Sequence, residues 1–230
     1  MAGEFQLTDA VPWGRSEQEY RLFFALDELP AGSRILDCAA GPSSFAAERA
    51  ASGRPVIAAD PLYAGSAEEI WARIDGAAAA MAAGLERACE RFVWDFSPTI
   101  EAHMQHRLRT ARQWREDFRA TGNSSRYIAG ALPHLPFADG AFGVALCSHF
   151  LFLYDERLGE AFHHRAVREM LRVAGEVRLF PLLDLHGRPS EMVSPVMAAL
   201  REQGYAVELR RVPYEFQKGG HTLLRIARRA

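Results

Sequence analysis

One stretch of the chain places two carboxylates and a run of small residues at a spacing that suits a nucleoside ligand. An apolar strand is expected to end at Asp37 and to lead into a turn of small residues, 38–44, before a helix that begins around Phe45. Small residues before a helix start let a ligand approach the backbone and its N–H groups. A second expected strand, PVIAAD, ends in Asp60, 23 residues after Asp37. Because an acid about 20 residues downstream meets the ribose in dinucleotide sites, the pattern predicts an adenosine-type ligand.

The charge of the turn narrows the choice of nucleoside. A dinucleotide site uses G-x-G-x-x-G, with the pyrophosphate over the helix start. This turn has one glycine, Gly41, and Pro42 removes an N–H group where a phosphate would need one. Asp37 is unfavourable beside a pyrophosphate and suits a cationic ligand such as S-adenosylmethionine, which has a sulfonium, an ammonium and no phosphate. A nicotinamide oxidoreductase is therefore less favoured, and an ordinary strand-to-helix connection is the alternative without a ligand.

The turn resembles motif I of class I methyltransferases, D-x-G-x-G-x-G, with Ala39 and Ser43 in place of two glycines. Alanine and serine adopt positive φ less readily than glycine, so the turn is expected to be shifted or to bind more weakly. The next strand, RYIAGALP, is expected over 126–133. It opens a second block, 126–156, which resembles small-molecule class I methyltransferases through LPF followed by F-x-V-x-L-C-S-H. Ala131 and Gly143 replace the acids usual there, so adenine would rely on backbone groups near Ala131 and Leu132 and on apolar packing.

Further segments extend the resemblance over nearly the whole chain: Trp13-Gly14-Arg15, FVWDFSP (92–98), LCSHFLFLYDE, EVRLFPLL and YEFQKGGHTLLRI. Together they resemble a bacterial family of class I methyltransferase-like proteins without a firmly assigned substrate. The resemblance implies a fold that binds S-adenosylmethionine and its product S-adenosylhomocysteine, and it does not imply a reaction. The cofactor-binding residues expected from the turn, the spacing and the resemblance are Asp37, Cys38, Ala39, Ala40, Gly41, Asp60, Pro61, Leu62, Ala131, Leu132 and Ser148.

Strand and helix patterns alternate along the chain and end in an antiparallel pair, 205–212 and 221–227. This order predicts an α/β fold with a doubly wound, Rossmann-like sheet of seven strands, the last of them antiparallel. We expect one domain over residues 1–230, with a helical insertion after the second strand at about 64–124. Ligands of such sheets lie outside the carboxyl ends of the strands, which would bring the candidate residues to one crevice.

The expected insertion opens with a capping box, Ser66 and Glu69. Its second helix is expected to begin at Ser97-Pro98 and to stop at Gly122-Asn123. Because the insertion follows Asp60 directly, we interpret it as a lid or an acceptor-binding cap. A scaffold or a homodimer interface is an equal alternative, since a helical pair can bury its apolar face either way.

The second insertion helix is rich in charge. His103 and His106 could share a face, but with no third ligand in view no metal site is predicted. The arginines are expected to meet solvent through ion pairs or to bind an anionic acceptor, rather than nucleic acid. They are Arg107, Arg109, Arg112, Arg115 and Arg119.

Composition sets broad limits on the partners. The chain of 230 residues is 49% hydrophobic and 24% charged with a net charge of −2, so it can bury a core and has no global reason to bind nucleic acid or membranes. Three widely spaced cysteines suggest a reducing compartment without disulfides. The N-terminal MAGEFQLTDA has no signal-peptide pattern, and no apolar run has the length of a membrane span. A cytoplasmic location is therefore predicted.

The best candidate for a catalytic base is His149, because it follows a strand at the expected crevice. Tyr154 is a second candidate, and Tyr214 and His221 are weaker ones. Positioning can account for much of a methyl transfer, and a base is needed only if the acceptor must lose a proton. A packed, hydrogen-bonded histidine is the alternative for His149. The sequence thus predicts a methyltransferase for an unidentified small-molecule acceptor, or a catalytically degenerate protein that binds the cofactor or its product.

Overall fold

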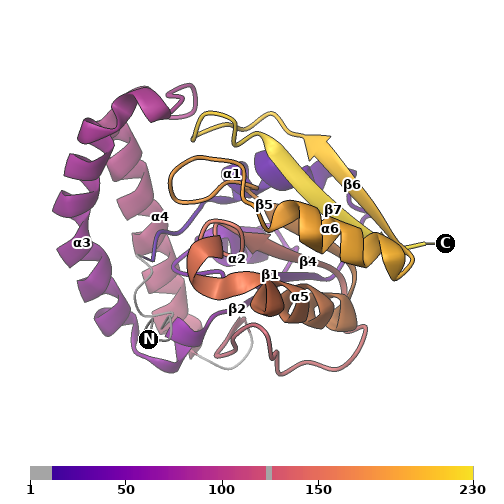
Figure 1. Ribbon diagram of the computed structural model, residues 1–230. Coiled ribbons are helices and arrows are strands. Elements are labelled where there is room, and N and C mark those ends of the chain that lie inside the picture. The colour runs from indigo at the N-terminus through magenta and orange to yellow at the C-terminus, as the bar shows by residue number, and fades with distance from the viewer. Residues whose placement is uncertain (1–11, 123–125, 230) are drawn as a thin grey trace, which may run out of the picture.

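The computed structural model describes residues 12–122 and 126–229, and these form a seven-stranded sheet with helices on both faces (Figure 1). Its strand order is β3-β2-β1-β4-β5-β7-β6. Strands β1 to β5 pair in parallel, and β7 is antiparallel to both neighbours, which confirms the predicted doubly wound sheet with a reversed last strand. Asn123 of the predicted helix stop lies outside the described residues. The strands are β1 (Ile35–Cys38), β2 (Val56–Ala59), β3 (Tyr127–Ile128), β4 (Phe142–Ser148), β5 (Ala174–Phe180), β6 (Tyr205–Arg211) and β7 (Thr222–Arg228).

The helices begin and end at residues that satisfy free backbone groups. Ser16 and Ser66 each form a capping box at the start of the first and third helices, as predicted for Ser66. Arg178, buried in the sheet, donates to the carbonyl oxygens of Phe24 and Ala25 at the end of the first helix. The helices are α1 (Glu17–Phe24), α2 (Phe45–Ala51), α3 (Ala67–Arg87), α4 (Ile100–Thr121), α5 (Asp155–Val173) and α6 (Val193–Glu202), with short 3-10 turns η2 (Leu26–Glu28), η3 (Pro61–Ala64) and η4 (Cys89–Arg91).

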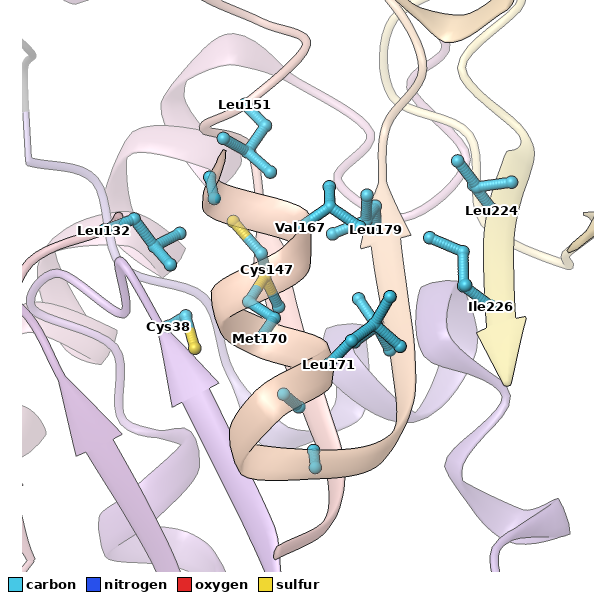
Figure 2. Packing of buried hydrophobic residues seen from close by; sticks show 14 of the residues in the cluster. Cys38, Leu132, Cys147, Leu151, Val167, Met170, Leu171, Leu179, Leu224 and Ile226 are labelled. Atoms are coloured by element: carbon cyan, nitrogen blue, oxygen red, sulfur yellow. The ribbon is translucent and has the colours of Figure 1, made fainter. Parts of the chain in front are cut away.

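Two hydrophobic layers cover the sheet because successive strand residues point to opposite faces. Residues such as Leu36 and Ala145 belong to the layer with α5 and α6, whereas Ile35 and Val144 belong to the layer with α1, α2 and the insertion. Figure 2 shows the first layer, where apolar side chains of α5 lie over β4 and β5 and beside β7. The labelled members of this packing include Cys147, Val167, Met170, Leu171, Leu179, Leu224 and Ile226.

The helices between β2 and β3 pack side by side at one side of the sheet (Figure 1). Ile70 and Ile74 of α3 and Trp114 and Phe118 of α4 are buried in the second layer. The insertion is therefore integrated into the core along its apolar faces. Its role as a lid, a cap or a homodimer interface stays a prediction.

Two predicted boundaries differ from the structure. Helix α4 begins after Thr99, whose Oγ1 accepts a hydrogen bond from the N–H of Ala102 at 3.0 Å, so the predicted start at Ser97-Pro98 is wrong. The strand expected over 126–133 is confined to Tyr127–Ile128. Beyond it the chain turns toward Pro136, so closely that a Cβ on Gly130 would lie 2.9 Å from the Pro136 Cδ atom.

Candidate functional site

The carboxyl ends of β1, β2, β3 and β4 border a cleft, which we call the strand-end cleft. It encloses about 90 Å³. Both predicted catalytic residues, His149 and Tyr154, line it. The predicted cofactor residues that line it are Ala39, Ala40, Gly41, Asp60, Pro61, Leu62, Ala131, Leu132 and Ser148.

Two predicted cofactor residues, Asp37 and Cys38, do not line the cleft. Asp37 is fully buried and accepts hydrogen bonds on both carboxylate oxygens from the Tyr20 hydroxyl, at 3.0 and 2.9 Å. Burial, with the nearby charge of Asp60, raises the pKa of Asp37 well above its ordinary value, although the Tyr20 hydrogen bond opposes this. Asp37 therefore fixes α1 to β1, and the charge expected at the turn entrance is withdrawn from the cleft.

The turn after β1 has the backbone conformation that glycine favours. Ala39 has φ 53° and Gly41 has φ 56°, so Ala39 holds a left-handed conformation that an alanine adopts at a cost. The Gly41 carbonyl oxygen accepts a hydrogen bond from the Tyr63 hydroxyl at 2.6 Å. Ser43 has no positive φ; its Oγ donates to the Arg15 carbonyl oxygen at 2.6 Å and accepts from the Phe45 N–H at 3.2 Å. The two departures from motif I thus differ: Ala39 occupies a conformation that favours glycine, whereas Ser43 does not need glycine and uses its hydroxyl in hydrogen bonds.

Asp60 is the carboxylate that does lie in the cleft. One of its oxygens accepts a hydrogen bond from the Gly41 N–H and the other from the Leu62 N–H, each at 2.9 Å. Burial raises the pKa of Asp60 to about 6, although the two backbone hydrogen bonds lower it. A carboxylate has about four acceptor sites, so each oxygen can accept one further hydrogen bond from a ligand.

His149 is tightly held at the inner end of the cleft. The backbone N–H of His149 donates to the Phe180 carbonyl oxygen at 2.6 Å, and its backbone has φ 52°. Its ring Nδ1 shares a hydrogen bond with the Ser148 Oγ at 2.7 Å. Burial, followed by the positive charges of Arg15 and Arg107, lowers the pKa of His149 well below its ordinary value. The imidazole is therefore neutral at pH 7 and a weak base. It is both packed, as in the alternative interpretation, and in contact with the cleft.

A second, larger hollow adjoins the cleft, and we call it the aromatic cavity. It encloses about 320 Å³ and shares Trp13, Arg15, His149 and Tyr154 with the strand-end cleft. Its walls come from α3, α4, the end of β5 and the loop between β6 and β7. The residues that give it its character are the aromatic Phe92, Phe180, Tyr214 and Phe216, the apolar Met81, Leu85, Leu153 and Leu185, and the polar His103 and Arg107.

The weaker catalytic candidates lie apart from the cleft. The Tyr214 hydroxyl, on the wall of the aromatic cavity, donates to Glu19 Oε1 at 3.0 Å. His221 lines neither the cleft nor the cavity. Its ring shares a hydrogen bond with the Gly219 carbonyl oxygen at 2.9 Å.

A buried ion pair stands behind the aromatic cavity. Glu19 of α1 is fully buried, and Arg107 of α4 donates to both of its oxygens. His106 Nε2 lies 3.0 Å from Glu19 Oε2. Burial alone would raise the pKa of Glu19, but the Arg107 charge and the hydrogen bonds from His106 and Arg107 hold it well below its ordinary value. The expectation that Arg107 meets solvent is therefore wrong, because Arg107 is buried and its partner is a buried carboxylate. Contact of Arg107 with an anionic acceptor stays a prediction.

The other insertion arginines lie on the outer face of the helical pair. Arg115 and Arg119 of α4 pair with Glu68 of α3. The Arg112 and Arg115 guanidinium groups lie over the Trp71 ring, at 5.7 and 5.1 Å from its centroid. This arrangement is the ion-paired surface that was expected for these side chains.

The segment Trp13–Arg15 forms the wall between the cleft and the cavity. A Cβ on Gly14 would lie 1.9 Å from the Pro42 carbonyl oxygen, so only glycine lets this segment rest on the turn after β1. Tyr20 and Phe150 also line the cleft, as does Gly130, which the sequence did not single out.

Within 12–122 and 126–229, no group of three or more His, Cys, Asp or Glu side chains is placed to hold a metal ion. In the same part of the chain, no helix combines the length and the apolar character needed to cross a membrane.

Solved structures resemble this fold at low sequence identity. Magnesium protoporphyrin IX methyltransferase from Synechocystis PCC 6803, solved with bound SAM, has a TM-score of 0.48 and 13% identity, over 90% of this chain and 74% of that one. A TehB-like SAM-dependent methyltransferase from Corynebacterium glutamicum has a TM-score of 0.48 and 14% identity, over 92% and 87% of the two chains. The fold assignment above rests on strand order and register.

No protein-family model matches this chain. A sequence relative, however, covers almost the whole chain. The Uncharacterized protein MJ0045 of Methanocaldococcus jannaschii is 34% identical over 223 residues, which are 96% of this chain and 98% of that protein. This relative is archaeal, so the bacterial character expected for the family is not supported. The chain belongs to the family of the archaeal protein MJ0045.

Proposed function

We propose that this protein is an S-adenosylmethionine-dependent methyltransferase that acts on a small-molecule acceptor. The observation that carries the proposal is the shared wall of the two hollows. A cleft suited to a nucleoside shares His149 and Tyr154 with a larger aromatic cavity. A cofactor bound in the cleft would supply an activated methyl group on a sulfonium centre, and the cavity offers the adjoining place for its acceptor.

The residues of the cleft fit an adenosyl group in chemistry. Asp60 has acceptor capacity for ribose hydroxyls, and Leu62, Ala131 and Leu132 offer apolar surface and backbone groups to a neutral base. Ala39 and Gly41 carry little or no side chain where the backbone turns. Benzene occupies a cavity of about 150 Å³. Since a nucleoside is larger and the cleft encloses about 90 Å³, a bound nucleoside would extend beyond the enclosed part of this open cleft.

The chain's own residues act mainly by positioning. The hydrogen bonds of His149 to Phe180 and Ser148 hold a neutral imidazole between the two hollows. Its low pKa makes it a poor general base, so the proposed transfer relies on orientation and on the exclusion of water. The insertion supplies Met81, Leu85 and His103 to the cavity wall, and we propose that it serves as the acceptor-binding cap.

A catalytically degenerate protein that binds the cofactor or its product is the second candidate. The weak basicity of His149 and the alanine held at φ 53° favour it. Calorimetry with S-adenosylhomocysteine, S-adenosylmethionine and NAD tests the cofactor. Selective binding of the first two supports both candidates, and selective binding of NAD overturns both. Formation of S-adenosylhomocysteine that depends on an added acceptor then separates the enzyme from the binder.

A further inference from the structure

Three side chains that line the aromatic cavity have a buried nitrogen atom without a hydrogen-bond partner among the residues the structure describes. These atoms are the Nε of Arg15, the Nε1 of Trp13 and the Nδ1 of His103. His103 Nε2 accepts a hydrogen bond from Arg107 Nε at 3.3 Å, and burial with the Arg107 charge lowers the pKa of His103 to about 2. The proton of the neutral ring is therefore assigned to Nδ1, and all three free groups are N–H donors. Such groups are costly to bury unless a ligand accepts from them.

The charge around the cavity is positive, which also favours a ligand that accepts hydrogen bonds. In the described part of the chain, Arg15 and Arg107 line the cavity and no carboxylate does. Glu19, behind the wall, compensates Arg107 directly, whereas Arg15 Nε lies 3.7 Å from Glu19 Oε1, too far for a hydrogen bond. One carboxylate thus faces two guanidinium groups. The wall keeps an excess of positive charge that an anionic ligand would complete.

The shape of the cavity suits a flat, apolar body. The Phe216 ring stacks on His103 with centroids 4.2 Å apart and on Phe92 at 4.7 Å, so this wall is a cluster of stacked aromatic rings. Benzene fills about 150 Å³. The cavity encloses about 320 Å³, which gives room for a body of roughly two rings.

We propose that the methyl acceptor is an aromatic carboxylate of about two rings, held in the aromatic cavity with its carboxylate on the N–H groups of Arg15, Trp13 and His103. The inference deepens the proposed function and rests on it. A carboxylate is ionised at pH 7 and needs no base, which agrees with the weak basicity of His149. One carboxylate oxygen forms the new O–C bond as the C–S bond of the sulfonium breaks, and that electron pair stays on sulfur. The products are a neutral methyl ester and S-adenosylhomocysteine, and no proton moves.

Calorimetry of the whole chain, saturated with S-adenosylhomocysteine, tests this with three compounds of equal size: 2-naphthoate, 2-naphthamide and 2-(aminomethyl)naphthalene. We expect the carboxylate to bind at least about tenfold more tightly than the amide, because a hydrogen bond to a charged acceptor is stronger than one to a neutral acceptor. The cation should bind least tightly. The proposal is overturned if the amide or the cation binds as tightly as the carboxylate.

Variants confined to the aromatic cavity locate the binding. His103→Phe keeps the ring on Phe216 and removes the Nδ1–H, so the preference for carboxylate over amide should fall several-fold. Met81→Trp should fill the cavity and abolish binding of all three compounds, and the exposed Arg54→Gln should change nothing. Unchanged binding in both cavity variants overturns the proposed site. These variants do not touch the strand-end cleft, so absence of S-adenosylhomocysteine binding in the wild type instead overturns the proposed function and with it the role of the acid as methyl acceptor.

Discussion

The strand-end cleft and the aromatic cavity share four residues, yet their other residues differ in type and come from different elements. Most of the cleft residues come from the turns at the ends of strands, with small side chains at 39–41 and one carboxylate, Asp60. The cavity consists of aromatic rings and N–H donors from α3, α4 and the loop between β6 and β7. A sheet therefore provides its own ligand-binding edge, whereas the selectivity for a second ligand comes from elements added around that edge.

The largest effect is expected from the buried charge behind the aromatic cavity, which has no counterpart in the cleft. Arg107→Met leaves Glu19 buried without its main partner, and such a change costs about 3–5 kcal/mol of unfolding free energy. Urea denaturation followed by circular dichroism measures it. The double variant Glu19→Gln, Arg107→Met should recover part of the loss, because it removes the buried negative charge, while Arg15 loses its ion pair with Glu19. A single variant within about 1 kcal/mol of the wild type would show that the pair is not a structural support of the cavity.

A smaller, local effect is expected in the cleft. Asp60→Ala removes the acceptor proposed for the ribose hydroxyls, so S-adenosylhomocysteine should bind about 1.5–3 kcal/mol more weakly, which is roughly 10- to 150-fold. Calorimetry gives the affinity, and thermal unfolding checks that the variant is folded. Asp60 also accepts from the N–H groups of Gly41 and Leu62, so Asp60→Asn, which keeps one acceptor oxygen, is the matched control. Equal affinity in a folded Asp60→Ala variant would remove Asp60 from the binding site.

The pH dependence of binding sharpens the contrast between the two hollows. Asp60 has its pKa raised to about 6 by burial, and only the ionised carboxylate can accept from both ribose hydroxyls. S-adenosylhomocysteine affinity should therefore be constant above pH 7 and should fall below pH 6, by at most about tenfold per pH unit for one proton. Asp60→Asn should flatten the profile. A wild-type profile that is flat from pH 5 to 8 would mean that the ionisation of Asp60 does not control binding.

The smallest effect concerns the turn after β1. Ala39→Gly relieves a left-handed alanine but frees the unfolded chain, so we expect a gain of at most about 1 kcal/mol in stability and equal or tighter S-adenosylhomocysteine binding. Ser43→Gly should instead lose about 1 kcal/mol, because Ser43 has no positive φ and supports the Arg15 carbonyl oxygen. Chemical denaturation and calorimetry compare the two variants. Loss of binding in Ala39→Gly would show that the turn differs in geometry from the one described.

The sequence predicted the cleft well because its signals are local. A strand, its terminal acid and the following small residues are adjacent in the chain. The pattern at Ala39–Gly41 and Asp60 was therefore enough to predict that these residues lie together at the ends of their strands. The doubly wound sheet with a reversed last strand followed from the alternation of strands and helices. Asp37 is the instructive exception, since its acid type suggested a ligand but strand alternation turned it toward Tyr20 on α1.

The aromatic cavity was not predicted because its residues meet only in the folded chain. The spacing of His103 and His106 suggests a shared helix face, and Arg107 belongs to a run of arginines expected to meet solvent or an anionic acceptor. Neither pattern reveals that α4 packs against α1 through Glu19. Helical spacing shows which residues share a face but not which element covers that face. Gly14 carried a usable signal, since a glycine between Trp13 and Arg15 indicates a close backbone approach.

The most direct test of the account is a crystal structure of the protein in complex with S-adenosylhomocysteine. We predict electron density for the ligand in the strand-end cleft, with the ribose hydroxyls on the Asp60 carboxylate, the adenine beside Leu62 and Ala131, and the sulfur at His149 and Tyr154 facing the aromatic cavity. Density at another place, or a sulfur atom directed away from the aromatic cavity, would contradict the claim that the two hollows together form one methyl-transfer site.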